Sequence, residues 1–229
     1  MQRTILCYGD SNTWGYVPQN FFDKNVTISR YSREQRWTGI LQIILGNYYH
    51  VVEEGLNSRT TNLDYPIYPD RNGKNYLAPC LYTHAPIDLV ILSLGGNDFK
   101  VYFNRKAEDI KCALAELIDI IQCSKYGLNM QSSPKILIIP PPIPLPIAER
   151  FCDENGIEVF KGAVDKAKKL VELYSILSHE KKCYFLDITQ FVFPSEIDGL
   201  HLDEKNHKNL ADKIANKITD IYMENNFII

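Results

Sequence analysis

The sequence lacks a strong charge of either sign, and it lacks any long apolar run. Its 229 residues carry 25 lysines and arginines against 28 aspartates and glutamates, so the net charge is −3. The absence of a basic excess predicts no nucleic-acid partner. No apolar stretch approaches the ~20 residues of a membrane-spanning helix, so we expect no membrane partner. The apolar run 4–8 is too short for the core of a signal peptide, which predicts a cytoplasmic location.

The sequence also lacks paired cysteines, clustered histidines and nucleotide-binding glycine motifs. None of the six cysteines forms a Cys-x-x-Cys pair, which predicts mostly buried, reduced thiols rather than disulfides or a zinc site. The five histidines show no ligand spacing, and His207 is expected on the exposed face of the last helix. Neither a Walker sequence nor Gly-x-Gly-x-x-Gly occurs. We therefore predict no metal and no organic cofactor. The cysteines are Cys7, Cys80, Cys112, Cys123, Cys152 and Cys183.

Apolar runs alternate with amphipathic stretches along the chain. The alternation is typical of an α/β fold with a mainly parallel sheet, and nothing in the composition marks a boundary inside a single domain of residues 1–229. The five predicted strands are 4–8, 48–52, 87–94, 135–139 and 183–187. The predicted helices are 35–45, 107–123, 155–179 and a last one that begins near Asp203, and 62–86 is expected to be a long loop with one short helix.

Four polar, glycine-bearing loops follow four of the predicted strands. In an open parallel sheet, ligands bind at the carboxyl ends of the strands. We therefore expect the four loops to form one pocket at that edge. They contain Gly9, Gly55, Gly95 and Gly199.

The first of these loops is Gly9-Asp10-Ser11-Asn12. Gly9 permits a sharp turn after the strand, and Asp10 and Ser11 suit a turn or the start of a helix. Such a turn can expose the Ser11 hydroxyl beside its own backbone N–H, which is what an acyl-transfer nucleophile needs. Taken alone, the stretch is also compatible with an ordinary turn.

The last loop contains Asp198-Gly199-Leu200-His201. An aspartate and a histidine at this spacing can share one tight loop, where the carboxylate binds one ring nitrogen and leaves the other free to accept a proton. The alternative is a turn aspartate and a histidine near the start of the last helix. The amide of Asn97 and the N–H groups of Ser11 and Gly55 are candidate donors to an oxyanion, although each is also compatible with a simple turn.

Together the four loops resemble the sequence blocks of the SGNH (GDSL-type) hydrolase superfamily. The blocks are Gly9-Asp10-Ser11-Asn12, Gly55, Gly95-Gly96-Asn97-Asp98 and Asp198-Gly199-Leu200-His201, in order along nearly the whole chain. The resemblance implies a three-layer flavodoxin-like fold, Ser11 as nucleophile, His201 as base and Asp198 as its orienting carboxylate. It also implies an oxyanion hole from Ser11, Gly55 and Asn97. Two positions depart from the pattern: Asn12 replaces the commonest leucine, and Glu54 replaces the asparagine that usually precedes the glycine.

A narrower resemblance is to the bacterial arylesterase/acyltransferase branch of that superfamily. It rests on Thr13-Trp14-Gly15, Arg36-Trp37-Thr38-Gly39, the stretch 53–61 and Asn97-Asp98 with Lys100 and Tyr102. The branch hydrolyses small acyl esters, can pass acyl groups to alcohols or peroxide, and often forms homo-oligomers, which we expect here. Core packing of Trp14 and surface positions for Arg59 and Lys100 are open alternatives. The residues expected to contact the substrate are Asp10, Asn12, Trp14, Arg59, Lys100, Tyr102, Leu200 and Leu202.

We therefore predict a serine esterase that acts on small acyl esters through an acyl-enzyme. The alternative is a carbohydrate O-deacetylase of the same superfamily, because aromatic-rich loops leave room for a sugar ring. Substrate preference can differ from that of other members through two segments: the insertion between Tyr16 and Arg36 and the proline-rich loop 140–146. A third interpretation is a non-catalytic flavodoxin-like module that binds phosphate or a flavin; the Asp10 carboxylate disfavours an anion in the first loop. The apolar tail 227–229 is expected to pack on the domain or on a neighbouring subunit.

Overall fold

Five parallel strands form one sheet in the computed structural model, which describes residues 2–21, 23, 27–65 and 68–223. Their order across the sheet is β2-β1-β3-β4-β5, and every neighbouring pair is parallel. The predicted α/β fold with a five-stranded, mainly parallel sheet is therefore confirmed. The tail 227–229 lies outside the described residues. The strands are β1 (Arg3–Gly9), β2 (Tyr49–Gly55), β3 (Leu89–Ser93), β4 (Lys135–Ile138) and β5 (Tyr184–Phe185).

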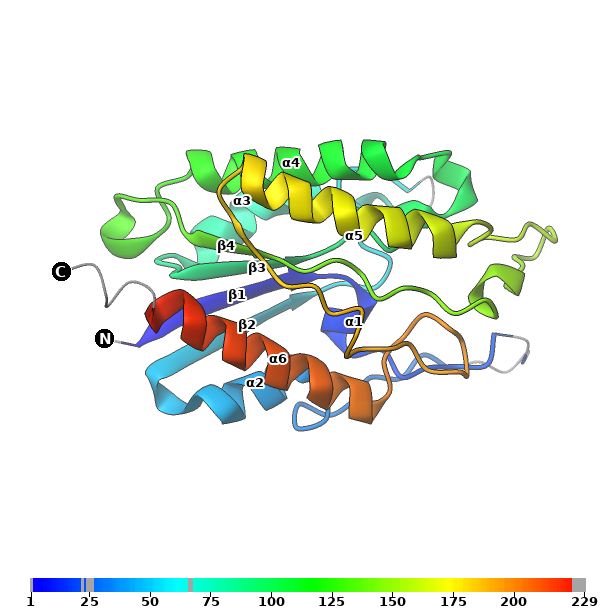
Figure 1. Cartoon of the computed structure of the whole chain (residues 1–229), viewed down its shortest axis with the longest axis horizontal. Helices are drawn as coiled ribbons and strands as arrows, with labels where there is room; N and C mark the ends of the chain where they lie inside the picture. The colour runs from blue at the N-terminus through cyan, green and yellow to red at the C-terminus, as the bar shows by residue number, and fades with distance from the viewer. Residues whose placement is uncertain (1, 22, 24–26, 66–67, 224–229) are drawn as a thin grey trace.

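Helices cover both faces of the sheet and complete three layers (Figure 1). On one face lie α2 (Trp37–Leu45) and α6 (Glu204–Met223), and on the other lie α3 (Gly73–His84), α4 (Ala107–Cys123) and α5 (Ala163–Glu180). The one-turn helix α1 (Ser11–Trp14) lies at the carboxyl end of the strands. No helix within the described residues is long and apolar enough to cross a membrane. Short 3-10 turns are η1 (Gly46–Tyr48), η2 (Pro69–Arg71), η3 (Asn97–Phe99), η4 (Val101–Phe103), η5 (Leu128–Met130) and η6 (Ala148–Arg150).

The side chains of β1 alternate between the two halves of the core, as a pleated strand requires. Ile5 and Cys7 pack with residues of α2 and α6, whereas Leu6 and Tyr8 pack with residues of α3, α4 and α5. All four side chains are fully buried. A strand covered on both faces must be apolar throughout, which is why this run of the sequence predicts a strand inside the sheet.

Three segments differ from the expectation. The helix expected at 155–179 begins only at Ala163, because Gly162 has a φ of +75° and the residues before it form turns. The segment 62–86, expected to be a long loop with one short helix, contains the twelve-residue helix α3, whose first turn is capped by the Asn72 side chain. Strand β5 is shorter than the expected 183–187.

The cysteines are free thiols, but their burial differs from the expectation. Cys7 and Cys80 are buried and Cys183 is half-buried, as expected of core thiols. The expectation is wrong for Cys112, Cys123 and Cys152, which are exposed. The first two lie on α4, whose inward positions are taken by alanine, leucine and isoleucine side chains.

His207 is completely buried on α6, so the expectation that it faces solvent is wrong. Its Nδ1 accepts a hydrogen bond from the backbone N–H of Trp37 at 3.3 Å, and the Tyr31 ring meets it edge-on. Because burial penalises the charged imidazolium, the pKa of His207 is lowered to about 4. The neutral ring therefore serves as a hydrogen-bond acceptor between α6 and the start of α2.

We expect His207 to make the folded protein less stable as the pH falls. The unfolded imidazole binds a proton near pH 6.5 and the folded one only near pH 4, so stability is lost as the pH falls between these values. The loss from this group reaches about 3 kcal/mol at the bottom of that window. Urea unfolding across it should show a steeper decline for the wild type than for His207→Asn, whose amide oxygen accepts the Trp37 N–H without titrating. Equal declines would contradict the prediction.

Candidate active site

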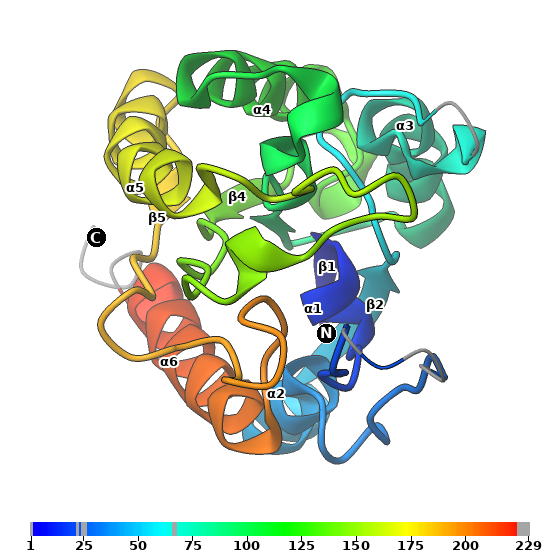
Figure 2. The same ribbon diagram turned by 90° about the vertical axis from the view of Figure 1, so that its right-hand side faces the viewer.

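Ser11 stands at the start of α1, directly beyond the carboxyl end of β1 (Figure 2). The chain can turn this tightly because residue 9 is glycine: a Cβ on Gly9 would fall 2.1 Å from Thr13 Oγ1. The Asp10 carboxylate caps the helix by accepting a hydrogen bond from the Asn12 N–H at 3.0 Å. Ser11 is thereby held at the edge of the sheet.

The loop between β5 and α6 brings Asp198 and His201 to the same edge. Asp198 Oδ1 accepts hydrogen bonds from the backbone N–H groups of Leu200 and His201, both at 2.9 Å, so the carboxylate closes its own loop. Gly199 has a φ of +71°, which favours glycine. Asp198 Oδ2 lies 2.7 Å from His201 Nδ1, and His201 Nε2 lies 3.0 Å from Ser11 Oγ. One chain of hydrogen bonds therefore joins Asp198 to Ser11.

Two further contacts hold this loop against the start of the chain. Asn12 Oδ1 accepts a hydrogen bond from the Leu202 N–H at 3.0 Å, and Asn12 Nδ2 donates to the Leu200 carbonyl at 3.3 Å. The Tyr16 ring stacks on the imidazole of His201 with 4.3 Å between centroids. The asparagine at position 12, unusual for its sequence block, thus binds the histidine loop through both ends of its amide.

The carboxyl end of β3 brings Asn97 to the cavity, whereas Gly55, at the end of β2, packs against α1 and does not line the cavity; Asn57 and Ser58 of the following loop do. A Cβ on Gly55 would fall 2.2 Å from the backbone nitrogen of Trp14, so α1 can lie on the end of β2 only because residue 55 is glycine. Asn97 begins η3, and its Nδ2 donates to the Arg59 carbonyl at 3.1 Å. This bond orients the Asn97 amide between the loops that follow β2 and β3.

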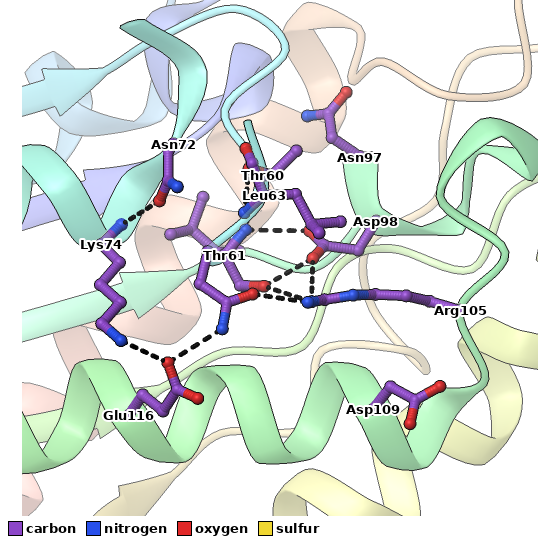
Figure 3. Close-up of polar contacts among 12 residues, drawn as sticks. Thr60, Thr61, Leu63, Asn72, Lys74, Asn97, Asp98, Arg105, Asp109 and Glu116 are labelled. Atoms are coloured by element: carbon purple, nitrogen blue, oxygen red, sulfur yellow. Dashed lines mark hydrogen bonds and ion pairs between the residues drawn. The ribbon is translucent and has the colours of Figure 1, made fainter. Parts of the chain in front are cut away.

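Asp98 joins the loops that follow β2 and β3 through buried polar contacts (Figure 3). Its fully buried carboxylate accepts hydrogen bonds from the Thr61 N–H at 3.0 Å and the Thr61 hydroxyl at 2.5 Å, and it pairs with Arg105 at 3.1 Å. Arg105 also donates to Asn62 Oδ1 at 2.7 Å. Burial raises the pKa of Asp98, while the Thr61 and Arg105 contacts oppose that rise. The position of Asn97 therefore depends on a buried ion pair next to it.

A cavity of about 270 Å³ opens beside Ser11 and His201. The insertion after α1 and the proline-rich loop both contribute to its wall. Its aromatic and proline lining consists of Tyr16, Phe21, Phe99, Phe151, Phe160, Pro141, Pro142 and Pro144. The other lining residues are Asp10, Ser11, Asn12, Ile28, Asn57, Ser58, Gly96, Asn97, Lys100, Leu200 and His201.

Two charged side chains lie in this wall, and burial moves both pKa values toward neutrality. The pKa of the Asp10 carboxyl is raised to about 6, chiefly because burial disfavours the carboxylate. The pKa of the Lys100 ammonium is lowered to about 8 by the same cause. Lys100 also donates to the Tyr65 hydroxyl and lies over the Phe160 ring at 5.6 Å. The cavity thus contains a weak acid and a weak base within an aromatic wall.

The structure places only half of the expected substrate contacts in the cavity wall. Arg59 is buried behind it and donates to the Gly9 carbonyl at 3.0 Å. The Tyr102 hydroxyl donates instead to Asp153 at 2.9 Å near the surface, and Leu202 is in the core. Among the described residues, those that line the cavity are Asp10, Asn12, Lys100 and Leu200, and those that do not are Trp14, Arg59, Tyr102 and Leu202.

Several cavity residues were not identified from the sequence. Tyr16, Phe21, Phe151 and Phe160 belong to loops that follow strands, and that location was the only available signal. Spacing along an irregular loop does not determine which ring turns inward, because that direction depends on tertiary packing. The sequence therefore indicates that these loops contribute to the cavity, but not which of their residues do so.

Comparison with known proteins identifies the class to which this fold and site belong. The fold and the site are those of the SGNH carboxylic ester hydrolases. The sequence profile of the GDSL-like lipase/acylhydrolase family matches residues 7–209, so the chain belongs to this family. The resemblance expected from the sequence is confirmed. No curated protein sequence matches the chain.

Solved structures of two kinds of esterase are similar to the chain. The native aryl esterase of M. smegmatis has a TM-score of 0.86 at 36% identity, over 95% of this chain and 99% of that one. Est24, a carbohydrate acetylesterase from Sinorhizobium meliloti, has a TM-score of 0.87 at 36% identity, over 96% and 100%. A carbohydrate acetylesterase family member from the same organism has a TM-score of 0.82 at 33% identity, over 95% and 97%. The chain is therefore an ester hydrolase rather than a non-catalytic binding module.

We expect Asp98→Asn to reduce both the stability of the protein and its ester hydrolysis. The amide keeps the shape of the side chain but leaves the Arg105 charge without its buried partner, at a cost of about 3 kcal/mol. Asp119→Asn is the matched control, because Asp119 pairs with Lys181 at the surface, where such a pair contributes less than about 1 kcal/mol. Urea unfolding and hydrolysis rates measured on both variants test this. Equal unfolding free energies for the two would show that the Asp98 pair does not support the site.

Proposed function

We propose that the protein is a serine esterase that hydrolyses small acyl esters through a covalent acyl-enzyme. The observation that carries this proposal is the chain of hydrogen bonds from Asp198 through His201 to Ser11, at 2.7 and 3.0 Å, beside a cavity. An orienting carboxylate, a base and a hydroxyl in this order are the parts that serine acyl transfer requires.

In the first half-reaction, Ser11 Oγ attacks the ester carbonyl carbon while His201 Nε2 accepts the hydroxyl proton. Asp198 accepts the hydrogen bond from Nδ1–H and stabilises the imidazolium that forms. The tetrahedral intermediate then collapses, its C–O bond to the alcohol breaks, and His201 returns the proton to the leaving alcohol. In the second half-reaction, water attacks the acyl-enzyme, His201 accepts a proton from that water, and the acid leaves as Ser11 regains its proton.

The negative oxygen of each tetrahedral intermediate needs hydrogen-bond donors. We assign this role to Ser11 and Asn97, which line the cavity, and not to Gly55, the third expected donor, which does not. The contacts of Asn97 support its part. Its amide group has two hydrogens, and the bond to the Arg59 carbonyl uses one of them. The other can donate to a substrate oxygen from a side chain whose orientation is already set.

The size and the wall of the cavity support the choice of substrate. A volume of about 270 Å³ is below the range of about 300–1,000 Å³ typical of small-molecule sites, which favours a short acyl group. Its aromatic rings can stack on a planar aryl alcohol or on the face of a sugar ring. Because an aryl esterase and a carbohydrate acetylesterase are each 36% identical to this chain, acetylated sugars are the second candidate substrate class.

The proposal extends to the fate of the acyl group and to the state of the protein. We infer that alcohols or peroxide can replace water as acceptor, since an aromatic wall binds an organic acceptor by direct contact. The resemblance to the arylesterase branch supports this transfer and a homo-oligomeric state. A single domain of residues 1–229 and a cytoplasmic location complete the proposal.

Ser11→Ala should abolish hydrolysis of para-nitrophenyl acetate, with kcat lower by at least about 10³-fold, because the acyl-enzyme cannot form. Ser178→Ala is the matched control: Ser178 is a buried serine on α5 whose hydroxyl donates to the Ser175 carbonyl at 2.6 Å. Circular dichroism of both variants confirms that they are folded. A folded Ser11→Ala variant that retains wild-type turnover would overturn the mechanism.

Turnover should fall as the acyl chain of para-nitrophenyl esters lengthens from acetate to octanoate, because the cavity has little room beyond a short chain. The same preparation, tested on acetylated sugars, distinguishes the two substrate classes by kcat/KM. A higher value for an acetylated sugar than for the aryl acetate would identify a carbohydrate deacetylase. Faster hydrolysis of octanoate than of acetate would contradict the size limit.

A further inference from the structure

A second cluster of reactive side chains lies against helix α3, apart from the lining of the cavity. It consists of Glu54 on β2 with Cys80 and His84 on α3. One oxygen, one sulfur and one nitrogen atom of these side chains lie within 4.8 Å of one another. Among the described residues, this is the one group of three potential metal ligands that lie so close together. Nothing in the esterase mechanism uses these side chains.

Two regular periodicities bring the three side chains together. Successive residues of a strand face opposite sides of the sheet, so Glu53 pairs with Arg36 before α2 while Glu54 faces α3 on the other side. Cys80 and His84 are four residues apart on a helix and therefore lie on one face of it. Figure 2 shows α3 on the same side of the sheet as α4, with α2 and α6 opposite. The Cys-x-x-x-His spacing is present in the sequence, but it is not visible when the histidines are compared only with one another.

We propose that Glu54, Cys80 and His84 bind one divalent cation of the zinc type, with a water molecule as fourth ligand. A thiolate, an imidazole and a carboxylate are ligands that zinc prefers, and sites with three protein ligands keep a fourth position open. The side chains of His84 and Glu54 are 26% and 18% exposed, so a cation and its water can enter from solvent. The cysteine sulfur forms the buried end of the site.

The geometry requires only a small adjustment to bind the ion. Ligand atoms about 2.0–2.3 Å from a tetrahedral zinc ion are about 3.5 Å apart, and the three atoms here are already within 4.8 Å. Without metal, His84 Nε2 lies 2.8 Å from Glu54 Oε1. The ion would replace that hydrogen bond with two coordinate bonds and move the two atoms slightly apart.

The charges balance once the thiol loses its proton. Burial and Glu54 raise the pKa of the metal-free Cys80 thiol to about 12, so the ion must displace this proton to solvent as the metal–sulfur bond forms. A thiolate and a carboxylate then neutralise the two positive charges of the ion. The Arg59 guanidinium, which lies over the Tyr76 ring at 5.7 Å, opposes binding as the nearby positive charge.

The cluster adjoins the esterase site through the backbone. Glu54 immediately precedes Gly55, and its carbonyl accepts a hydrogen bond from Arg59. An ion held by Glu54 would therefore tie the end of β2 to α3 directly beside Gly55, against which α1 packs. Its role would be to stabilise that strand end, because none of its ligands lines the cavity.

Titration with cobalt(II) tests the site, because a cobalt–thiolate bond adds a near-ultraviolet charge-transfer band and four-coordinate cobalt absorbs in the visible. We expect one equivalent of cobalt per chain, displaced by one equivalent of zinc. Cys80→Ser should remove the charge-transfer band, and His84→Gln, which changes a partly exposed side chain, should weaken binding by at least about tenfold. Zinc should raise the thermal unfolding midpoint of the wild type, raise that of His84→Gln by less, and leave that of Cys80→Ser unchanged.

Cys123→Ser is the matched control, since Cys123 is an exposed thiol on α4, and it should bind cobalt as the wild type does. Ser11→Ala should also bind normally, which separates this inference from the proposed esterase mechanism. Absence of the band in the wild type would overturn the inference and leave a hydrogen-bonded cluster. A band that persists in Cys80→Ser or disappears in Cys123→Ser would overturn it as well, by assigning the bound metal to an exposed thiol.

Discussion

The site depends on the close approach of helix α1 to the ends of two neighbouring strands. A Cβ on Gly9 would overlap Thr13, and a Cβ on Gly55 would overlap the backbone of Trp14, so both glycines make room for the same short helix. Because Ser11 begins that helix, its position follows from backbone packing rather than from the polar side chains around it. The hydroxyl therefore stands at the edge of the sheet before any partner is added.

Polar contacts then attach the remaining loops to this fixed point. The Asn12 amide binds the loop that carries His201, which comes from the other end of the chain, and the Asp98 carboxylate joins the loops that follow β2 and β3. These two sets of contacts differ in burial, since the Asp98 side chain is fully buried while Asn12 lines the cavity. Replacing Asp98 therefore affects folding as well as the position of Asn97. The Asn12 contacts chiefly affect the position of the imidazole.

The fold and the approach of the site loops follow from local sequence patterns. A nearly continuous apolar run such as 87–94 predicts a strand covered on both faces, and parallel strands end at one edge, which places Ser11 and His201 together. The directions of single side chains do not follow, because they depend on tertiary packing. Arg59 and Tyr102 belong to two motifs at the edge of the sheet. Arg59 nevertheless turns into the core, and Tyr102 turns toward Asp153. His207 is polar on a helix that carries many charges, and the packing of α2 and the Tyr31 ring against α6 buries it.

The cavity wall constrains the acyl group through charge as well as through size. Burial moves the pKa values of Asp10 and Lys100 to about 6 and about 8, and the two charges attract each other weakly, without a direct contact. A substrate that displaces water from the cavity lowers the local dielectric and strengthens this attraction. An uncharged acyl group adds no charge to the cavity, whereas an anionic one would be buried near the Asp10 carboxylate, which repels it. The electrostatics of the wall therefore favour the same short, neutral acyl groups that its volume admits.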